Sequence, residues 1–224
     1  MISNPFALLR RYENVASISL LTKTDQVHTD DEIQEKIGAK TLASLWQMHG
    51  PLSIIVREGS ERTKQADGIL TDTKDLSLTI RVADCQAFVF LVPEKGIIGL
   101  LHAGWRGLVA GTIPECIRVL KEEWKIDPST VLVGAGPSLC TACAEFSDPV
   151  NELPGIDPSF FHGRNVDLRG IADSQLRFAG IRAEHIERHA DCTRCHPDLY
   201  WSFRGGDRTK VEKGWTNVLT ATLI

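Results

Sequence analysis

The chain has 224 residues, of which 42% are hydrophobic and 24% are charged, an ordinary balance for a globular protein. Its formal net charge of −4 argues against a broad nucleic-acid-binding surface, although a local cationic pocket is compatible with that charge. The apolar runs are too short to span a bilayer, and the N-terminus lacks the pattern of a signal peptide. Because six cysteines occur without such a signal, we expect a reducing compartment and a cytoplasmic protein.

The first half of the chain is predicted to form mostly strands. We expect these strands at residues 16–22, 52–56, 76–82, 88–92 and 96–101. Thr29 and Glu32 form a capping box that predicts a helix ending near Ile37. Alternation of large apolar with smaller or polar residues makes 76–82 a half-buried strand. The turn Pro93–Gly96 joins the last two strands, which predicts a central hairpin.

The second half combines helices with strands. Apolar residues at helical spacing predict helices over 108–124 and 168–179, the second stopped by Gly180. Residues 131–133 and 215–224 are predicted strands, and 146–165 is predicted to be loop. Because strands outnumber helices and several are hairpin neighbours, we predict an α+β fold with residues 1–224 as a single domain.

Residues 99–111 form the most informative segment of the sequence. A buried-looking strand ends at His102, and a Trp105–Arg106 pair bracketed by glycines leads into a helix. A strand-to-helix turn exposes side chains at the end of a sheet, where α/β proteins tend to bind ligands. Glycines let a ligand approach the backbone, and the Arg106 guanidinium can fork onto a phosphate or carboxylate.

Three strand-like segments end in a residue that can bind a transition metal. These residues are His49, Cys85 and His102. Two imidazoles and one thiolate with an open fourth position are typical of a catalytic zinc site. The alternative is three unrelated residues, with the histidines bonded in turns and Cys85 acting as a small buried hydrophobe.

Two Cys-x-x-Cys pairs lie far apart in the second half of the chain, Cys140 with Cys143 and Cys192 with Cys195. The spacing within each pair suits zinc, but the gap between the pairs is much longer than in a compact zinc ribbon. A structural zinc site, a disulfide and ordinary thiols are the open alternatives, and we expect ordinary half-buried thiols.

An ordered set of short motifs runs through residues 40–205. The first group comprises Gln47-x-His49-Gly50, Ala66-Asp67-Gly68, Ala83-Asp84-Cys85 and His102-Ala-Gly-Trp-Arg-Gly107. The second group comprises Gly136-Pro137, Glu145-Phe146, Asp167-Leu168, Gln175-Leu176, Cys192-Thr193 and Ser202-x-Arg204. With these motifs the chain resembles the YfiH/laccase-domain family. Members of that family carry the names polyphenol oxidase, purine nucleoside phosphorylase and peptidoglycan editing factor.

The resemblance implies a fold, a metal site and an activity. The fold would be a mixed β-sandwich flanked by helices, similar in shape to the catalytic domain of cytotoxic necrotizing factors. His49, Cys85 and His102 match the three zinc ligands of the family. The implied reactions are phosphorolysis of adenosine, inosine or methylthioadenosine and deamination of adenosine. The partners would then be a nucleoside and phosphate, with no nucleic acid, membrane or obligate protein partner expected.

The resemblance also implies roles for residues beside the triad. We expect Arg106 to bind phosphate or orient the substrate, and Trp105 to stack on the purine unless it packs in the core. Asp67 and Asp84 are both candidates for proton transfer or for orienting a ligand imidazole. Asp67 is also a candidate for binding the substrate. For Asp84 a turn-capping role is an equal alternative. Cys85, His102, Arg106 and Asp84 are therefore the predicted catalytic residues.

The sequence departs from the family pattern at two places. Ala87 replaces the proline that usually follows Ala-Asp-Cys-x, and Arg204 to Lys210 replaces the usual Arg-Arg and Thr-Gly-Arg elements. The sequence therefore does not determine whether residues 204–214 contact the substrate. The three predicted metal ligands, in contrast, are all present.

Three rival functions remain. Cys85 and His102 can form the nucleophile–base pair of a hydrolase that acts on peptidoglycan precursors. A copper polyphenol oxidase is disfavoured because no His-x-His pair, the motif of multicopper oxidases, occurs among the seven histidines. A non-catalytic zinc module is disfavoured because structural sites normally close with four protein ligands.

Overall fold

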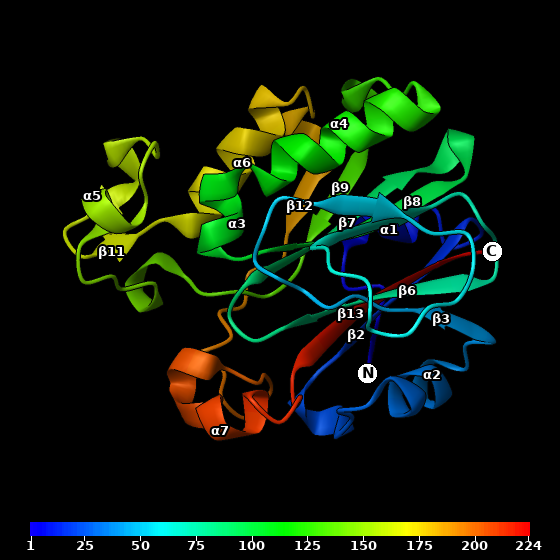
Figure 1. Cartoon of the computed structure of the whole chain (residues 1–224), viewed down its shortest axis with the longest axis horizontal. Coiled ribbons are helices and arrows are strands. Elements are labelled where there is room, and N and C mark those ends of the chain that lie inside the picture. Colours follow the sequence, from blue (N-terminus) through cyan, green and yellow to red (C-terminus); the bar gives the residue numbers. More distant parts are fainter.

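Two mixed β-sheets packed face to face form the centre of the computed structural model, which describes residues 1–224 (Figure 1). The five-stranded sheet has the order β1 (Ile2–Ser3), β2 (Ala16–Leu21), β13 (Asn217–Leu223), β6 (Leu76–Val82) and β3 (Thr41–Ala43). The six-stranded sheet has the order β12 (Ile186–Arg188), β9 (Leu132–Ala135), β7 (Gln86–Val92), β8 (Ile97–Ala103), β5 (Gly68–Thr71) and β4 (Ser53–Ile55). The predicted α+β class is confirmed.

Helices cover the outer face of the six-stranded sheet. These are α3 (Trp105–Ala110), α4 (Thr112–Trp124) and α6 (Leu168–Phe178) (Figure 1). On the other side of the molecule α2 (Asp30–Ile37) packs near β3 with the predicted Thr29–Glu32 capping box. The remaining elements are short: α1 (Ala7–Arg10), α5 (Pro149–Glu152), α7 (Arg208–Val211) and the hairpin of β10 (Phe161–His162) with β11 (Asn165–Val166). No helix has the length and apolar character needed to cross a membrane.

The core consists of two apolar layers that share the six-stranded sheet. Strand β7 shows how one sequence serves both layers: Phe88 and Phe90 face the helices, whereas Val89 and Leu91 face the second sheet. Because successive side chains point to opposite faces, a strand buried on both faces needs a continuous apolar run. The predicted hairpin of β7 with β8 is confirmed, and its turn ends at Gly96 with φ +59°.

Three expectations about the elements are wrong in detail. The helix expected over 108–124 is two helices, because Gly111 between them adopts φ +81°. The expected loop 146–165 contains α5 and β10. Strand β6 is buried on both faces rather than one, since the guanidinium of Arg81 is covered by an ion pair with Asp30 and by backbone carbonyls.

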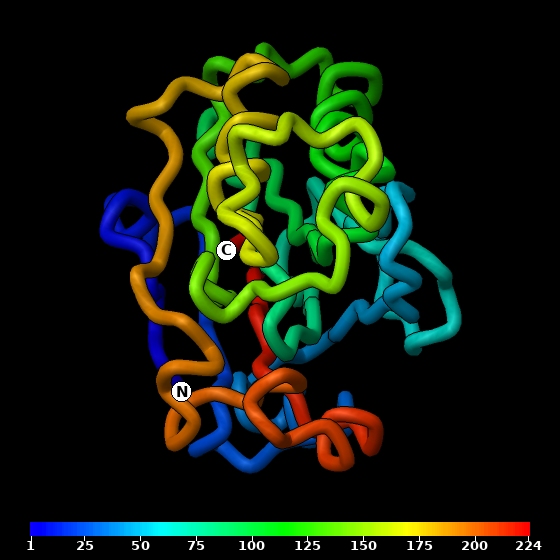
Figure 2. The backbone as a smooth tube through the Cα atoms, turned by 90° about the vertical axis from the view of Figure 1, so that its left-hand side faces the viewer, coloured from blue at the N-terminus to red at the C-terminus, as the bar shows by residue number.

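Two connections cross from one sheet to the other and carry sequence motifs with them. Residues 44–52 lead from β3 to β4, and residues 83–85 lead from β6 to β7. A third long segment, between α6 and α7, descends along one side of the molecule (orange in Figure 2). The functional site lies where these three segments meet.

Candidate active site

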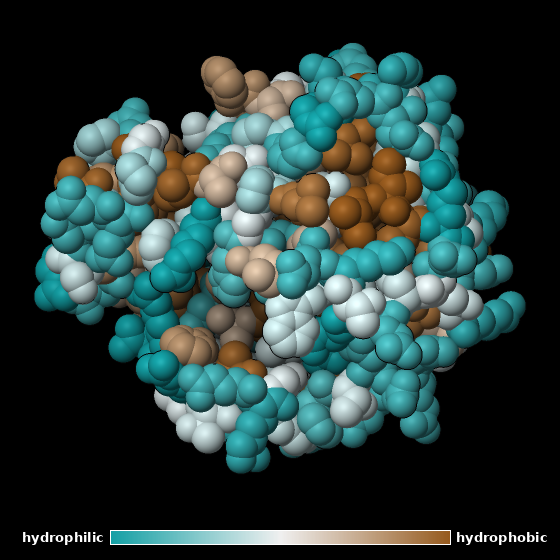
Figure 3. All heavy atoms as spheres, in the orientation of Figure 1, coloured by the Kyte–Doolittle hydropathy of each residue, from teal (hydrophilic) through white to brown (hydrophobic).

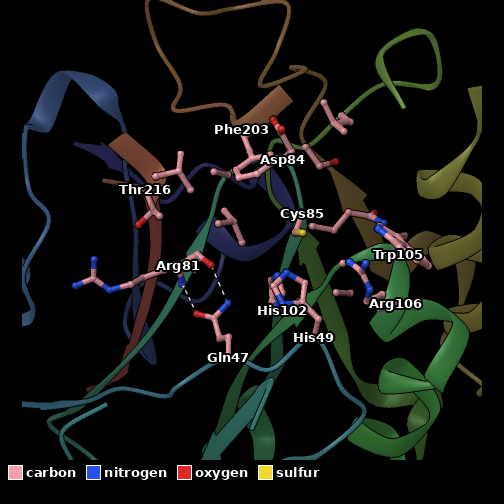
Figure 4. A pocket seen from close by; sticks show the side chains of 18 of the residues that line it. Gln47, His49, Arg81, Asp84, Cys85, His102, Trp105, Arg106, Phe203 and Thr216 are labelled. Atoms are coloured by element: carbon pink, nitrogen blue, oxygen red, sulfur yellow. Dashed lines mark hydrogen bonds between the residues drawn. The ribbon is translucent and has the colours of Figure 1, made fainter. Parts of the chain in front are cut away.

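The structure brings together the three residues predicted to bind metal. His49 lies on the connection from β3 to β4, Cys85 on the connection from β6 to β7, and His102 near the end of β8. Their ligand atoms all lie within 4.8 Å of one another, and the three side chains point toward a common point (Figure 4). The two imidazole rings meet edge to face, with their centroids 4.7 Å apart.

Asp67 holds both histidines of this triad. Its Oδ1 lies 2.7 Å from Nδ1 of His102, so this nitrogen donates to the carboxylate and Nε2 is left to bind a metal. The same carboxylate accepts the backbone N–H groups of Met48, His49 and Gly50. Asp67 is 1% exposed and does not line the cavity described below, so it lies behind the triad.

Gln47 fixes the other side of the His49 loop. Its side-chain amide accepts from the backbone N–H of Arg81 and donates to the carbonyl of the same residue, at 2.9 and 2.8 Å (Figure 4). The loop is therefore tied to a strand of the five-stranded sheet as well as to Asp67. This support is consistent with the left-handed backbone of His49, φ +60°, which is unfavourable for a non-glycine residue.

The triad is electrostatically coupled. Burial by itself raises the pKa of the Cys85 thiol, but the charge of His102 and hydrogen bonds from both histidines outweigh burial and lower that pKa to about 6. Burial also favours neutral His102, but the Cys85 charge and the bond to Asp67 raise the pKa of His102 to about 9. Without metal, the pair is thus a thiolate beside an imidazolium at neutral pH.

Gly104 allows this close packing. A Cβ on Gly104 would lie 2.9 Å from Sγ of Cys85 and 2.9 Å from Cδ2 of His49. Such distances are shorter than a van der Waals contact, so only glycine fits here. The same residue begins α3 and thereby directs Trp105 and Arg106 toward the cavity.

The triad opens onto a cavity of about 530 Å³, within the range of small-molecule sites. In the space-filling view a hollow lies between the parts that carry α5 and α7, bordered mainly by hydrophilic side chains (Figure 3). Arg106 lines the cavity, is exposed, and lies over the Trp105 ring at 4.2 Å without an ion pair to any residue. Trp105 also meets Phe146 edge to face, so part of its surface serves packing.

Asp84 organises another part of the cavity wall. Its Oδ1 accepts the hydroxyls of Thr193 and Ser202 at 2.8 and 2.6 Å, and its Oδ2 accepts the backbone N–H of Arg204 at 2.7 Å. The residue is 7% exposed and has φ +88°. These bonds tie Asp84 to the segment that carries Thr193, Ser202 and Arg204, whereas its predicted part in proton transfer stays a prediction.

Several residues that line the cavity were not among the predicted site residues. These are Arg62, Arg81, Phe203, Arg204, Val211 and Thr216. Ser202-x-Arg204 stood among the sequence motifs and was the one available signal for this wall. Part of the segment 204–214 borders the cavity, whereas its contact with a substrate stays a prediction.

Comparison with known proteins identifies the family. Residues 21–216 match the model of the family described as multi-copper polyphenol oxidoreductase laccase. The chain belongs to this family. Its laccase-family relatives include a purine nucleoside phosphorylase of Aquifex aeolicus, 35% identical over 69% of this chain and 71% of the relative.

Two further relatives are aligned over shorter parts of the chain. Purine nucleoside phosphorylase YlmD of Geobacillus stearothermophilus is 31% identical over 62% of this chain and 54% of that protein. An adenosine deaminase named RL5, from an unknown prokaryotic organism, is 28% identical over 62% of this chain and 56% of its own length. The chain thus spans about half the length of the first curated relatives it matches.

Solved structures share the fold. YfiH of Bacillus licheniformis superposes with a TM-score of 0.81 at 20% identity, covering 99% of this chain and all of that one. YlmD of Geobacillus stearothermophilus gives 0.80 at 24% identity, covering 98% and 93%. The predicted β-sandwich flanked by helices, similar to YfiH, is therefore confirmed.

Proposed function

We propose that this chain is a zinc-dependent purine nucleoside phosphorylase that also deaminates adenosine. The observation that carries the proposal is the convergence of His49, Cys85 and His102 in a cavity that is also lined by Arg106, which has no ion-pair partner. Relatives named purine nucleoside phosphorylase and adenosine deaminase support the substrate class.

The donor set of the triad fits zinc. One thiolate and two imidazoles leave a fourth position open toward the cavity, as catalytic zinc requires. Asp67 behind His102 supplies the carboxylate partner that commonly orients a zinc-binding imidazole. The triad is the sole cluster of candidate ligands that contains histidine, so the chain has no second histidine cluster that could hold further copper ions of a multicopper oxidase. Bound zinc would supply a Lewis acid that activates water or stabilises developing negative charge.

The remaining residues bind and orient the substrates. Arg106 presents a free guanidinium to the cavity and would hold the phosphate of the phosphorolysis reaction. The cavity is large enough for a nucleoside, and Trp105 and Phe203 offer apolar surface for the purine base. Asp67 would position His102 and the His49 loop without touching the substrate, and Asp84 would hold the wall that carries Arg204.

A thiol hydrolase is the second candidate function. The low pKa of Cys85 beside His102, with Asp67 on the far nitrogen of the imidazole, is the arrangement of a nucleophile, base and orienting acid. That function would use Cys85 without a metal, on substrates such as peptidoglycan precursors, and it leaves His49 without a chemical role.

The variant His49→Ala distinguishes the two functions. The purified chain is assayed for zinc, for adenine and ribose 1-phosphate from adenosine with phosphate, and for inosine formation. We expect the variant to lose the zinc bound by the triad and both activities. A folded variant that has no zinc at the triad but turns over substrate at the wild-type rate would refute the zinc mechanism and favour the hydrolase.

Arg106→Lys tests the phosphate site. Because an ammonium cannot form two parallel bonds to a phosphate, we expect the KM for phosphate to rise about tenfold or more while the zinc content is unchanged. Unchanged phosphorolysis kinetics would contradict this role. Arg57→Lys is the matched control, since Arg57 is paired to Asp72 on the surface and does not line the cavity.

A further inference from the structure

Four cysteines form a second cluster outside the cavity. Cys140 and Cys143 follow β9, and Cys192 and Cys195 follow β12. Strands β9 and β12 are parallel neighbours in the sheet, so the segments that follow them leave from the same end. The four sulfurs consequently lie within 4.8 Å of one another. The long gap in sequence between the two Cys-x-x-Cys pairs thus does not keep them apart in space, and the expectation of ordinary half-buried thiols competes with a shared metal site.

The sulfur geometry fits one tetrahedral ion. Sγ of Cys195 lies 3.6 Å from that of Cys143 and 4.0 Å from that of Cys140. Four sulfurs placed tetrahedrally at about 2.3 Å from zinc are about 3.8 Å apart. A disulfide requires about 2.05 Å, and all six cysteines of the chain are free thiols. The distances thus match metal ligands better than an oxidised pair.

Hydrogen bonds hold the two cysteine-bearing segments together independently of a metal. The Arg169 guanidinium donates to the carbonyls of Ser138 and Leu139 in one segment and of Ala190 and Asp191 in the other. The backbone N–H of Cys140 points at Sγ of Cys192, 3.3 Å away, a bond that stabilises a thiolate. The ligands are therefore arranged before an ion binds.

We propose that Cys140, Cys143, Cys192 and Cys195 bind a structural zinc ion. Four thiolates close the coordination sphere, so this site has no open position for a substrate. Its purpose follows from its neighbours: Ser138 and Leu139 line the cavity, and Thr193 bonds to Asp84 beside Cys85. The ion ties together the two segments that form one wall of the cavity.

Zinc counting in site-specific variants tests the proposal. His49→Ala/His102→Ala removes two ligands of the triad and keeps all four cysteines. We expect it to retain about one zinc per chain, with four sulfurs at about 2.3 Å and no nitrogen in X-ray absorption spectra. Removal of this zinc by a chelator should lower the melting temperature. Zinc content, X-ray absorption and melting temperature are measured without any catalytic assay. The test of the four-cysteine site is therefore valid even if the proposed function is wrong.

The reciprocal variant is Cys140→Ser/Cys195→Ser. If it folds, it should lose the zinc bound by four sulfurs, whereas Cys116→Ser should keep it, because Cys116 is buried on α4 and belongs to neither cluster of candidate ligands. A His49→Ala/His102→Ala protein that, grown with zinc, holds no metal and has all four cysteines of the cluster as free thiols would overturn the proposal. Iron in the site, or a disulfide within the cluster, would overturn it equally.

Discussion

At the residue scale, one buried carboxylate organises the candidate active site. Asp67 bonds the imidazole of His102 and three successive backbone N–H groups around His49. Its pKa is lowered: burial opposes ionisation, but the bonds from His102 and the backbone outweigh burial. Two of the three predicted metal ligands thus depend on a residue that binds no metal itself.

We expect Asp67→Asn to weaken zinc binding by about 10- to 100-fold, because the neutral amide orients the imidazole less well and raises its basicity less. Competition with a chromogenic chelator measures the dissociation constant. Asp157→Asn is the control, since that exposed residue caps a short helix, a role asparagine also performs. An unchanged zinc affinity in Asp67→Asn would contradict this role.

The ionisation of Cys85 gives a second prediction at this scale. In zinc-free protein the pKa of about 6 means that the thiolate predominates at neutral pH and disappears only as the pH falls through about 6. We expect alkylation of Cys85 by iodoacetamide, followed by peptide mass spectrometry, to show this midpoint. Zinc should protect the thiol. Cys116, whose pKa burial raises to about 12, should stay unreactive. A midpoint near 9 for Cys85 would show that no ion pair with His102 forms.

At the element scale, the turn from β8 into α3 decides how closely the ligands approach. Gly104 lies where any Cβ would collide with Cys85 and His49. Gly107, one turn further along α3, has more room, because a Cβ there would meet Cγ2 of Thr112 at 3.3 Å. The two glycines of the same motif therefore carry different constraints.

We expect Gly104→Ala to lose most of the zinc bound by the triad, and its activity, while remaining folded, because the added methyl group displaces Cys85 and His49. Gly107→Ala should keep its zinc, since a shift of a few tenths of an ångström accommodates the methyl group. Zinc content and circular dichroism of both variants provide the measurement. Equal zinc content in the two proteins would show that the ligands do not need this close approach.

At the scale of the whole molecule, the end of the chain completes the sheet that its beginning starts. Strand β13 lies between β2 and β6 and pairs antiparallel with both. Leu219 on β13 is 0% exposed and belongs to the apolar layer between the two sheets. The crossings that carry His49 and Cys85 lead out of this five-stranded sheet, so its integrity supports the site.

We expect Leu219→Ala to lower the free energy of unfolding by about 2–5 kcal/mol, through lost burial and the cavity left behind. Urea denaturation measures the change. Ile224→Ala, at an exposed position just beyond the strand, is the control and should change stability by less than about 0.5 kcal/mol. Equal effects of the two substitutions would mean that β13 is not part of the stable core.

The sequence by itself determined the α+β class, most strands, the capped helix α2 and the three residues of the triad, because these depend on local periodicity, caps and ordered motifs. It did not determine the break at Gly111, where a backbone conformation interrupts a helical pattern. Only the tertiary structure revealed that Asp67 lies behind the ligands, that Asp84 holds residues 193–204, and that two distant cysteine pairs meet. The physical reason is that parallel neighbouring strands and crossings between sheets bring residues together over distances in sequence that no local pattern encodes.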